Sequence, residues 1–286
     1  MNIALIGIGY WGRKLEIAIN NHPDLNLMYK TGSGPREKIL SDKDVDAVII
    51  ATPIKTHYEV AKDALLHNKH VYSAKPLATN TRDMDELIAI AKDKGLHISV
   101  DYTTTFSSEL PEIKNSIGLM GGAKVMLMKN CNWGRFNEYD VYWLYASHML
   151  AMLSLFKDLG DLKFEFSDIV VDNDICNIGY IKFDCGRISV SRLSHDRKFQ
   201  IDFHCIDGIV RYHPLKIFKL SISKPGSITR NWSTRCTRSS AWSDTGIEMS
   251  LNHFYNVLIG KEESNIQMAR KVTEIISTRG DELDIL

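Results

Sequence analysis

The feature that most constrains the fold is a glycine-rich turn close to the start of the chain. Gly7, Gly9 and Gly12 form a G-x-G-x-x-G pattern between an apolar run and an amphipathic segment. The first glycine of such a pattern permits a tight turn, the second lets the backbone approach a pyrophosphate, and the third lets helix and strand pack closely. The pattern favours a dinucleotide site over an ordinary glycine turn, with the helix N-terminus facing the phosphates. The residues expected to bind the cofactor here are Gly7, Ile8, Gly9, Tyr10, Trp11 and Gly12.

Strand and helix signals alternate through the first hundred residues, as in a parallel sheet whose strands are joined by crossover helices. The run VDAVIIA at residues 45–51 is almost continuously apolar, which is typical of a strand covered on both faces. The expected strands are residues 2–7, 25–29, 45–51, 70–73 and 96–101, and the expected helices are residues 10–20, 56–68 and 79–94.

The pattern changes after residue 103. Runs such as IGYIKFD, RISVSRL and FQIDFHC alternate between apolar and polar side chains, which favours a largely antiparallel sheet with one exposed face. We therefore predict an α/β protein with a Rossmann domain (a doubly wound parallel sheet) at residues 1–103 and a C-terminal α/β domain with an open sheet at residues 104–286. Because a broad sheet face needs cover, we expect a homodimer or homotetramer formed through the C-terminal sheet.

The end of the second expected strand bears on which dinucleotide is bound. An acidic residue for the ribose 2′-hydroxyl is usual about 20 residues after the glycine pattern, but this strand ends in Lys30, Thr31, Gly32 and Ser33, with Arg36 nearby. Hydroxyl and cationic groups accept a 2′-phosphate where a carboxylate would repel it. Lys30, Thr31 and Ser33 therefore favour NADP over NAD, although a merely shortened loop would also account for them.

Composition excludes several classes of partner. Lysine plus arginine and aspartate plus glutamate number 35 each, so no overall field attracts nucleic acid or an anionic membrane. No segment reaches the roughly 20 apolar residues of a membrane helix. Five cysteines without a C-x-x-C pair argue against a metal site or a disulfide framework and favour the cytoplasm.

Residues 45–80 carry a resemblance to a known family. Ala51-Thr52-Pro53 is followed by His57, and Lys75-Pro76 comes shortly after a segment that ends in HNKHV. This arrangement resembles the Gfo/Idh/MocA family, named for glucose–fructose oxidoreductase and inositol dehydrogenase, which pairs a Rossmann domain with a C-terminal α/β domain. The resemblance implies that Ala51, Thr52, Pro53, His57, Lys75 and Pro76 lie at the cofactor, and that Lys75 touches both nicotinamide and substrate. For His57, a capping role at the start of its helix is the alternative.

A second stretch, residues 132–152, is similar to the NDP-sugar dehydrogenase branch of that family. There, a segment with Asp-Val, Trp and a later histidine lies in the substrate cleft, and Asp140, Trp143 and His148 match it. The resemblance implies a small sugar or sugar-nucleotide substrate, possible work in surface-polysaccharide synthesis, and substrate contacts from Lys75, Tyr102, Asp140, Trp143, Tyr145 and His148. A reductase of a non-sugar carbonyl or imine compound is a further alternative.

Two positions depart from the family pattern. Ala74 stands where a glutamate is expected before Lys75, and Leu144 stands where an aspartate is expected four residues before His148. The family uses both carboxylates to orient or assist catalysis. Their loss keeps open an alternative function, a catalytically impaired protein that binds the cofactor and serves as a sensor or regulatory subunit.

The candidate catalytic pair is Lys75 and His148. Oxidising a secondary alcohol needs a base for the hydroxyl proton while hydride leaves for the nicotinamide. His148 titrates near neutrality, and Lys75 would hydrogen-bond the same oxygen. The plainer alternatives are a buried histidine held by its neighbours and an exposed lysine in a turn. A polar loop at residues 227–243, with three arginines and two tryptophans, is expected either to clamp a nucleotide diphosphate or to be a solvated connection.

Overall fold

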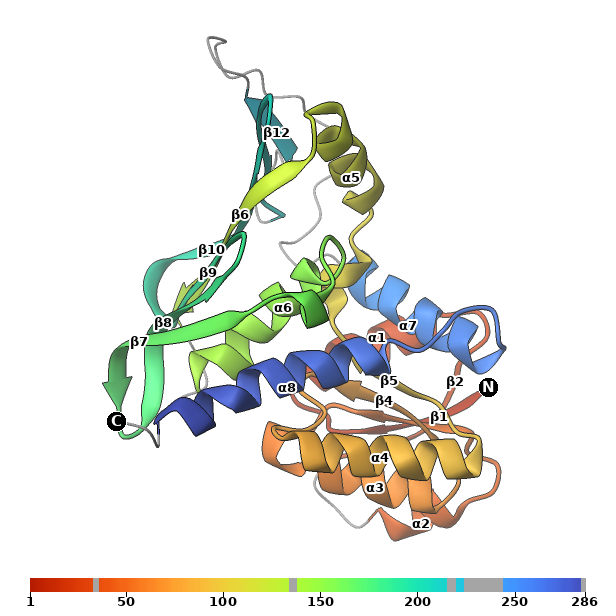
Figure 1. Cartoon of the computed structure of the whole chain (residues 1–286). Helices are drawn as coiled ribbons and strands as arrows, with labels where there is room; N and C mark the ends of the chain where they lie inside the picture. Colours follow the sequence, from red (N-terminus) through yellow and green to blue (C-terminus); the bar gives the residue numbers. More distant parts are fainter. Residues whose placement is uncertain (33–35, 134–137, 215–219, 224–243, 284–286) are drawn as a thin grey trace. The chain divides into compact units, whose positions relative to one another are not determined.

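The computed structural model describes residues 1–32, 36–133, 138–214, 220–223 and 244–283 (Figure 1). The chain forms two compact units. The Rossmann unit consists of Met1–Phe106 together with Asp244–Leu286, and the second unit consists of Ser107–Ser243.

The Rossmann unit is built on a parallel sheet of five strands in the order β2-β1-β3-β4-β5. In Figure 1, α2, α3 and α4 lie together on one face of this sheet. The strands are β1 (Asn2–Ile6), β2 (Asn26–Thr31), β3 (Ala47–Ile50), β4 (His70–Ala74) and β5 (Ile98–Asp101), and the helices are α1 (Tyr10–Asn21), α2 (Glu37–Ser41), α3 (His57–Leu66), α4 (Thr81–Lys94), α7 (Asp244–Leu258) and α8 (Ile266–Leu283), with short helical turns η1 (Ile54–Thr56) and η2 (Thr103–Phe106).

The strands of this sheet are buried because helices cover both faces. All four residues of β3 are inaccessible to solvent, as expected for an apolar run in the middle of a parallel sheet. One core cluster joins Ile3 and Leu5 of β1 to Leu15 of α1 and to Leu251 and Phe254 of α7. The carboxyl ends of the parallel strands thus lie on a rigid frame.

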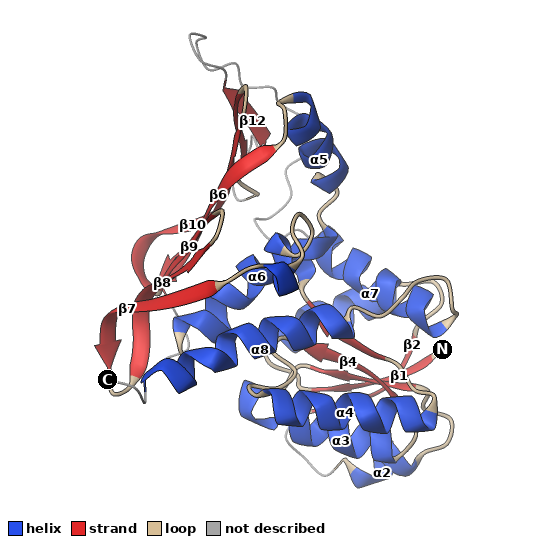
Figure 2. Cartoon of the chain, in the orientation of Figure 1, coloured by secondary structure: helices blue, strands red, loops and turns tan. Residues whose placement is uncertain are grey.

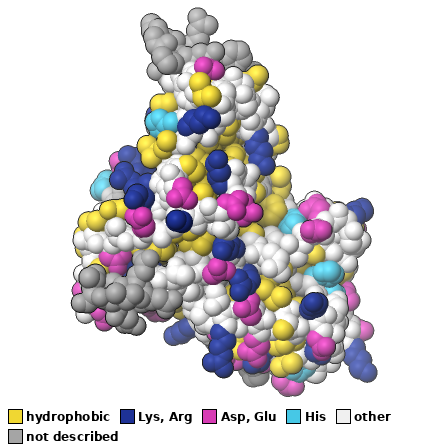
Figure 3. Space-filling view, viewed as in Figure 1, with side chains coloured by type: hydrophobic (Ala, Val, Ile, Leu, Met, Phe, Trp, Pro, Cys, Tyr) yellow, Lys and Arg dark blue, Asp and Glu magenta, His cyan; other side chains and the backbone are white. Residues whose placement is uncertain are grey.

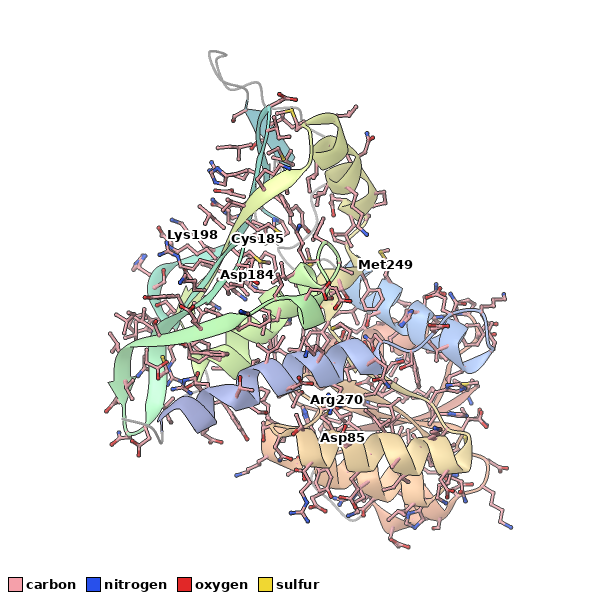
Figure 4. All side chains as sticks on the ribbon, in the orientation of Figure 1. Asp85, Asp184, Cys185, Lys198, Met249 and Arg270 are labelled. Atoms are coloured by element: carbon pink, nitrogen blue, oxygen red, sulfur yellow. The ribbon has the colours of Figure 1, made fainter. Side chains whose placement is uncertain are left out.

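The C-terminal helices mark a difference from the expected domain division. The expectation placed all of residues 104–286 in the second domain, whereas Asp244–Leu286 clusters with the Rossmann unit. The apolar face of α7 completes the core over α1, and α8 contacts α4. Arg270 of α8 donates to Asp85 of α4 at 2.6 Å, and both side chains are labelled in Figure 4.

The second unit is built on a sheet of seven strands in the order β12-β11-β10-β6-β9-β8-β7 (Figure 2). Only β6 and β9 pair in parallel among the described strands. The strands are β6 (Ala123–Trp133), β7 (Phe164–Asp172), β8 (Ile175–Phe183), β9 (Gly186–Ser191), β10 (Leu193–Cys205), β11 (Gly208–Tyr212) and β12 (Leu220–Ser223), and the helical segments are α5 (Leu110–Leu119), η3 (Tyr142–Ala146), α6 (Ser147–Leu153) and η4 (Leu159–Asp161). The predicted fold class, a Rossmann domain followed by a largely antiparallel α/β unit, is confirmed.

Neither unit offers a helix suited to crossing a bilayer, as far as the described residues go. On the face seen in Figure 3, lysine and arginine side chains are interspersed with aspartate and glutamate over the Rossmann unit. The charge on that face is mixed, in keeping with the equal totals of the sequence.

Candidate active site

The glycine-rich turn has the geometry that its sequence pattern predicts. Gly7 has a φ of +107°, and a Cβ there would lie 2.3 Å from the carbonyl carbon of Ala51. A Cβ on Gly12 would lie 1.8 Å from the carbonyl oxygen of Gly7. A Cβ on Gly9 would meet nothing within 4 Å. Gly7 and Gly12 are thus required for the packing of the turn, whereas the backbone at Gly9 is open.

The helix that follows this turn presents free donors. Gly9 is the N-cap of α1, no side chain caps the helix, and its first turn contains no acidic residue. Backbone N–H groups at such an end, together with the helix dipole, favour an anion. Ile8 and Tyr10 beside it are 48% and 61% exposed, so the turn can accept a dinucleotide pyrophosphate.

His57 joins the two loops that follow β3 and β4. Its Nδ1 lies 2.7 Å from the carbonyl oxygen of Pro76, and its Nε2 lies 2.7 Å from that of Thr52. Burial lowers the pKa of His57, and the two carbonyl contacts oppose that shift. With only 1% of its surface exposed, the ring holds the Thr52-Pro53 and Lys75-Pro76 segments together rather than facing an open surface.

Lys75 follows β4 directly and is partly buried at the carboxyl edge of the sheet. Burial lowers the pKa of Lys75 to about 7, against the opposing effect of the neighbouring Asp101 carboxylate. An amine that titrates there exchanges a proton readily at neutral pH. In open α/β sheets, ligands bind beyond the carboxyl ends of the strands, and this is where Lys75 lies.

Asp101, the last residue of β5, is a site residue that sequence reasoning missed. Its side chain is 2% exposed. Trp11 Nε1 donates to Oδ2 at 3.0 Å and Ser250 Oγ donates to Oδ1 at 3.1 Å. Burial raises the pKa of Asp101 to about 6, while hydrogen bonds from Tyr72, Ser250 and Trp11 and the charge of Lys75 lower it. The available signal was an acidic residue that ends a buried apolar strand (ISVD), beside the edge where Lys75 was expected.

At the end of β2, the candidate groups for a 2′-phosphate already have acidic partners. Lys30 Nζ lies 2.6 Å from Glu16 Oε1, and Arg36 Nε donates to Asp63 at 3.0 Å. The carbonyl of Thr31 accepts the N–H of Gly7 at 2.8 Å, which ties this strand end to the glycine turn. Ser33 lies outside the described residues.

In the second unit, the candidate substrate residues lie on a π-helical turn. This turn, η3, runs directly into α6. Between residues 141 and 150, the partly exposed side chains are those of Trp143, Tyr145 and His148, and the other seven are buried. π-Helical turns occur frequently at functional sites. This segment therefore presents the three side chains that the family resemblance picks out.

The other candidates around that segment have structural contacts. Asp140 Oδ1 accepts the N–H of Tyr142 at 2.8 Å, and Oδ2 accepts the N–H of Cys176 at 3.2 Å. Both carboxylate oxygens thus hold the backbone at the start of the turn. Leu144 is 9% exposed, and Tyr102, in the Rossmann unit, is 1% exposed. The loop at residues 227–243 lies outside the described residues.

No group of three or more metal-ligating side chains occurs in the part of the chain that the structure describes. Cys131, Cys176, Cys185 and Cys205 are thiols. The groups that the structure brings together belong to the Rossmann unit: the glycine turn, the Thr52-Pro53 segment, His57, and the Lys75-Pro76 segment with Asp101 beneath it.

Comparison with known proteins agrees with this arrangement. Residues 29–102 match the model of the GFO_IDH_MocA oxidoreductase family, described as an NAD-binding Rossmann fold. The chain belongs to the Gfo/Idh/MocA family. The resemblance seen in the sequence is thus confirmed.

Two curated relatives match part of this Gfo/Idh/MocA chain. A scyllo-inositol 2-dehydrogenase (NADP(+)), IolU of Bacillus subtilis, is 33% identical over 97 residues, which cover 34% of this chain and 29% of the relative. A 2,7-anhydro-N-acetylneuraminate hydratase of Escherichia coli is 26% identical over 155 residues, covering 48% and 42%. The chain thus spans less than half the length of either relative in these matches.

Solved structures match over nearly the whole chain. KijD10, a 3-ketoreductase from Actinomadura kijaniata in complex with NADP and TDP-benzene, superposes with a TM-score of 0.83 at 15% identity, covering 97% of this chain and 96% of that one. A biliverdin reductase from Synechocystis, in complex with biliverdin and NADP+, superposes with a TM-score of 0.77 at 13% identity, covering 98% of each chain. At these identities the likeness establishes the two-unit fold.

Proposed function

We propose that the protein is an NAD(P)-dependent oxidoreductase that moves a hydride between nicotinamide and a secondary alcohol or ketone of a sugar or sugar nucleotide. The observation that carries the proposal is the meeting of two features at one sheet edge. The glycine turn is open at Gly9, and Lys75, with a pKa of about 7, follows the neighbouring part of the same sheet. Such an arrangement serves a dinucleotide-linked reaction at a hydroxyl or carbonyl group.

The residues present fit a dinucleotide. Gly7 to Gly12 would hold the pyrophosphate through backbone N–H groups, and the Thr52-Pro53 and Lys75-Pro76 segments, held together by His57, would line the nicotinamide end. An oxidised nicotinamide ring, when bound, supplies the acceptor for the hydride that leaves the carbinol carbon.

The chain's own residues then handle the proton. In the oxidative direction, His148 accepts the hydroxyl proton as the hydride leaves, and Lys75 donates a hydrogen bond to the same oxygen. In the reductive direction the proton returns to that oxygen. This mechanism requires His148 of the second unit and Lys75 of the Rossmann unit to face one substrate, which is part of the proposal.

A sugar nucleotide is the substrate class we propose. Trp143 and Tyr145, partly exposed next to His148, would pack on the sugar ring. The structural likeness to a 3-ketoreductase in complex with NADP and TDP-benzene supports this choice. We place the reaction in the cytoplasm, possible work in surface-polysaccharide synthesis included, because the described cysteines are thiols.

A direct assay tests the function. The protein is mixed with NADP(H) or NAD(H) and a panel of sugar nucleotides, sugars, inositols and non-sugar carbonyl compounds, and both nicotinamide absorbance and cofactor binding are followed. Turnover that is lost in His148→Gln supports the proposal. Cofactor binding without turnover on any compound contradicts it and favours the sensor or regulatory alternative, to which Ala74 and Leu144 already point.

The cofactor preference gives a prediction at the end of β2. We propose NADP, with Lys30 turning from Glu16 to the 2′-phosphate. Lys30→Ala is then expected to weaken NADP(H) binding about tenfold, the lower end for a hydrogen bond to a charged group because Lys30 is exposed. NAD(H) affinity should not change. Glu16→Gln is the matched variant, expected to tighten NADP(H) binding, and calorimetry measures all three. An equal loss of both cofactors in Lys30→Ala would contradict the preference.

The second unit gives a prediction about assembly. Val125 and Leu127 of β6 are each 39% exposed, Trp133 is 68% exposed, and Leu193 of β10, its register partner, is 47% exposed. We propose that these side chains contribute to a homodimer or homotetramer. Leu127→Asp is expected to raise the dissociation constant about 30-fold or more, as at a central apolar contact. Light scattering during size exclusion measures it, with Leu119→Asp, on α5 and 76% exposed, as the control. A wild-type monomer would contradict the proposal.

A further inference from the structure

A buried carboxyl group lies under the candidate lysine. Asp101 ends β5, and the β4–β5 register pairs it directly with Ala74, the residue before Lys75. Its side chain is 2% exposed, compared with 36% or more for a typical surface carboxylate. Placing a carboxylate there is costly unless donors or a cation compensate.

Several groups provide that compensation. Trp11 Nε1 and Ser250 Oγ donate to its two oxygens at 3.0 and 3.1 Å, and Tyr72 OH lies 2.8 Å from Ser250 Oγ. Lys75 adds an electrostatic attraction, because each of the two charges favours the ionised form of the other. Hydrogen-bond donors and a cation both stabilise the anion. The surroundings of Asp101 are therefore arranged for a carboxylate.

The same contacts connect the parts of the candidate site. Trp11 lies in the first turn of α1, within the glycine turn, and Ser250 lies on α7. Asp101 thus joins the glycine turn to the strand end that carries Lys75 and to the C-terminal helix that covers the sheet. A carboxylate at position 74 would lie on the neighbouring strand at the same level, because Ala74 and Asp101 are register partners.

We propose that Asp101 is a positioning residue of the active site, whose carboxylate holds Lys75 and Trp11 in place and takes the part of an acidic side chain at position 74. The proposal rests on the proposed function, since Lys75 acts on substrate there. Asp101 itself touches neither substrate nor cofactor in this role, and it acts through Lys75.

The role has a measurable electrostatic consequence. Burial pushes the pKa of Lys75 down to about 7, and Asp101 is the group that opposes this shift. Without the carboxylate, Lys75 would lose its proton at a lower pH and would be a poorer hydrogen-bond donor at neutrality. In turnover, kcat should fall near pH 7 while KM for the cofactor stays the same, with the pH profile displaced to the acid side.

Lysine acetylation measures the titration of Lys75 without any substrate. The protein is treated briefly with acetic anhydride across a pH series, and modification of Lys75 is quantified by mass spectrometry against the exposed Lys43 as internal reference. In Asp101→Asn the midpoint for Lys75 is expected about one pH unit lower than in the wild type. Asp93→Asn, an exposed carboxylate of α4, should leave the midpoint unchanged. The same midpoint in Asp101→Asn and wild type would overturn the proposal.

A rescue variant tests the exchange of positions. Adding Ala74→Glu to Asp101→Asn restores a carboxylate at the register partner, so the midpoint of Lys75 should return toward the wild-type value. A double variant that behaves like Asp101→Asn would overturn the claim that Asp101 takes the part of a side chain at position 74.

A second measurement covers the case in which Asp101→Asn does not fold. The indole N–H of Trp11, assigned among the five tryptophans by Trp11→Phe, should report the ionisation of Asp101 by NMR with a midpoint near pH 6. In Lys75→Met the midpoint should move up, because a stabilising cation is lost. An unmoved midpoint would overturn the proposal. Neither measurement needs turnover: a protein without activity but with these shifts contradicts the proposed function only, and an active enzyme without them contradicts the role of Asp101 only.

Discussion

Replacing Lys75 with alanine is expected to lower kcat by about 10²–10⁴-fold, the range for losing a positioned proton donor or acceptor. Affinity for NADP(H) should remain measurable, because the glycine turn supplies the pyrophosphate contacts through its backbone. Stopped assays with the substrate found by the panel, and calorimetry for the cofactor, measure the two effects. Undiminished turnover in Lys75→Ala would contradict the assignment of this lysine to catalysis.

The variant is also expected to stay folded, for a reason that pH can test. The pKa of Lys75 is lowered to about 7 in the folded protein from an ordinary 10.5, so the folded state binds this proton more weakly than the unfolded chain does. Below pH 7 both states are protonated and the cost of burying the charge is fully present, and it disappears as the pH rises from 7 to 10.5. Lys75→Ala should therefore gain stability relative to the wild type most clearly below pH 7. Lys92→Ala, on the exposed side of α4, is the control for both activity and stability.

Alanine at Gly9 and alanine at Gly12 are expected to fail in different ways. Nothing lies within 4 Å of a Cβ on Gly9, so Gly9→Ala should fold normally. It should nevertheless bind dinucleotide about ten- to hundredfold more weakly, because the methyl group keeps the phosphates from the backbone donors. A Cβ on Gly12 would lie 1.8 Å from the carbonyl oxygen of Gly7, so Gly12→Ala should lose about 1–3 kcal/mol of stability or more together with binding.

Thermal unfolding and calorimetry separate the two outcomes. Gly118→Ala is the matched control, because it lies in α5 of the second unit with open space around it and should bind cofactor like the wild type. If Gly9→Ala bound dinucleotide with full affinity, the phosphates would not lie over this turn, and the proposed orientation of the nicotinamide toward Lys75 would be lost with them.

The Rossmann sheet was predictable because its signals are local. VDAVIIA became the fully buried β3, and HVYS began β4 at the expected residue. The glycine pattern specified its own turn, since each glycine is required by a contact a few residues away or by the next strand. Two short helices, α2 and α5, were not predicted, because neither carries a long apolar periodicity.

The electrostatics of the site was not predictable in the same way. Asp101 acquires its role from Trp11, which is 90 residues away, and from Ser250, which is 149 residues away. Asp140 matched a motif, but the structure uses both of its oxygens for backbone N–H groups. In each case the identity of the side chain was visible in the sequence, whereas its partners depended on the tertiary fold.

The return of α7 to the first sheet has a consequence for biosynthesis. Ile247, Leu251 and Phe254 complete the core that begins with Ile3 and Leu5, and Ser250 supplies a donor to Asp101. A nascent chain therefore cannot finish its nucleotide-binding half until the ribosome has translated the intervening 137 residues of Ser107–Ser243. Until then the half-made sheet exposes apolar surface that a chaperone would recognise, and the emerging chain acquires a dinucleotide site only near the end of its synthesis.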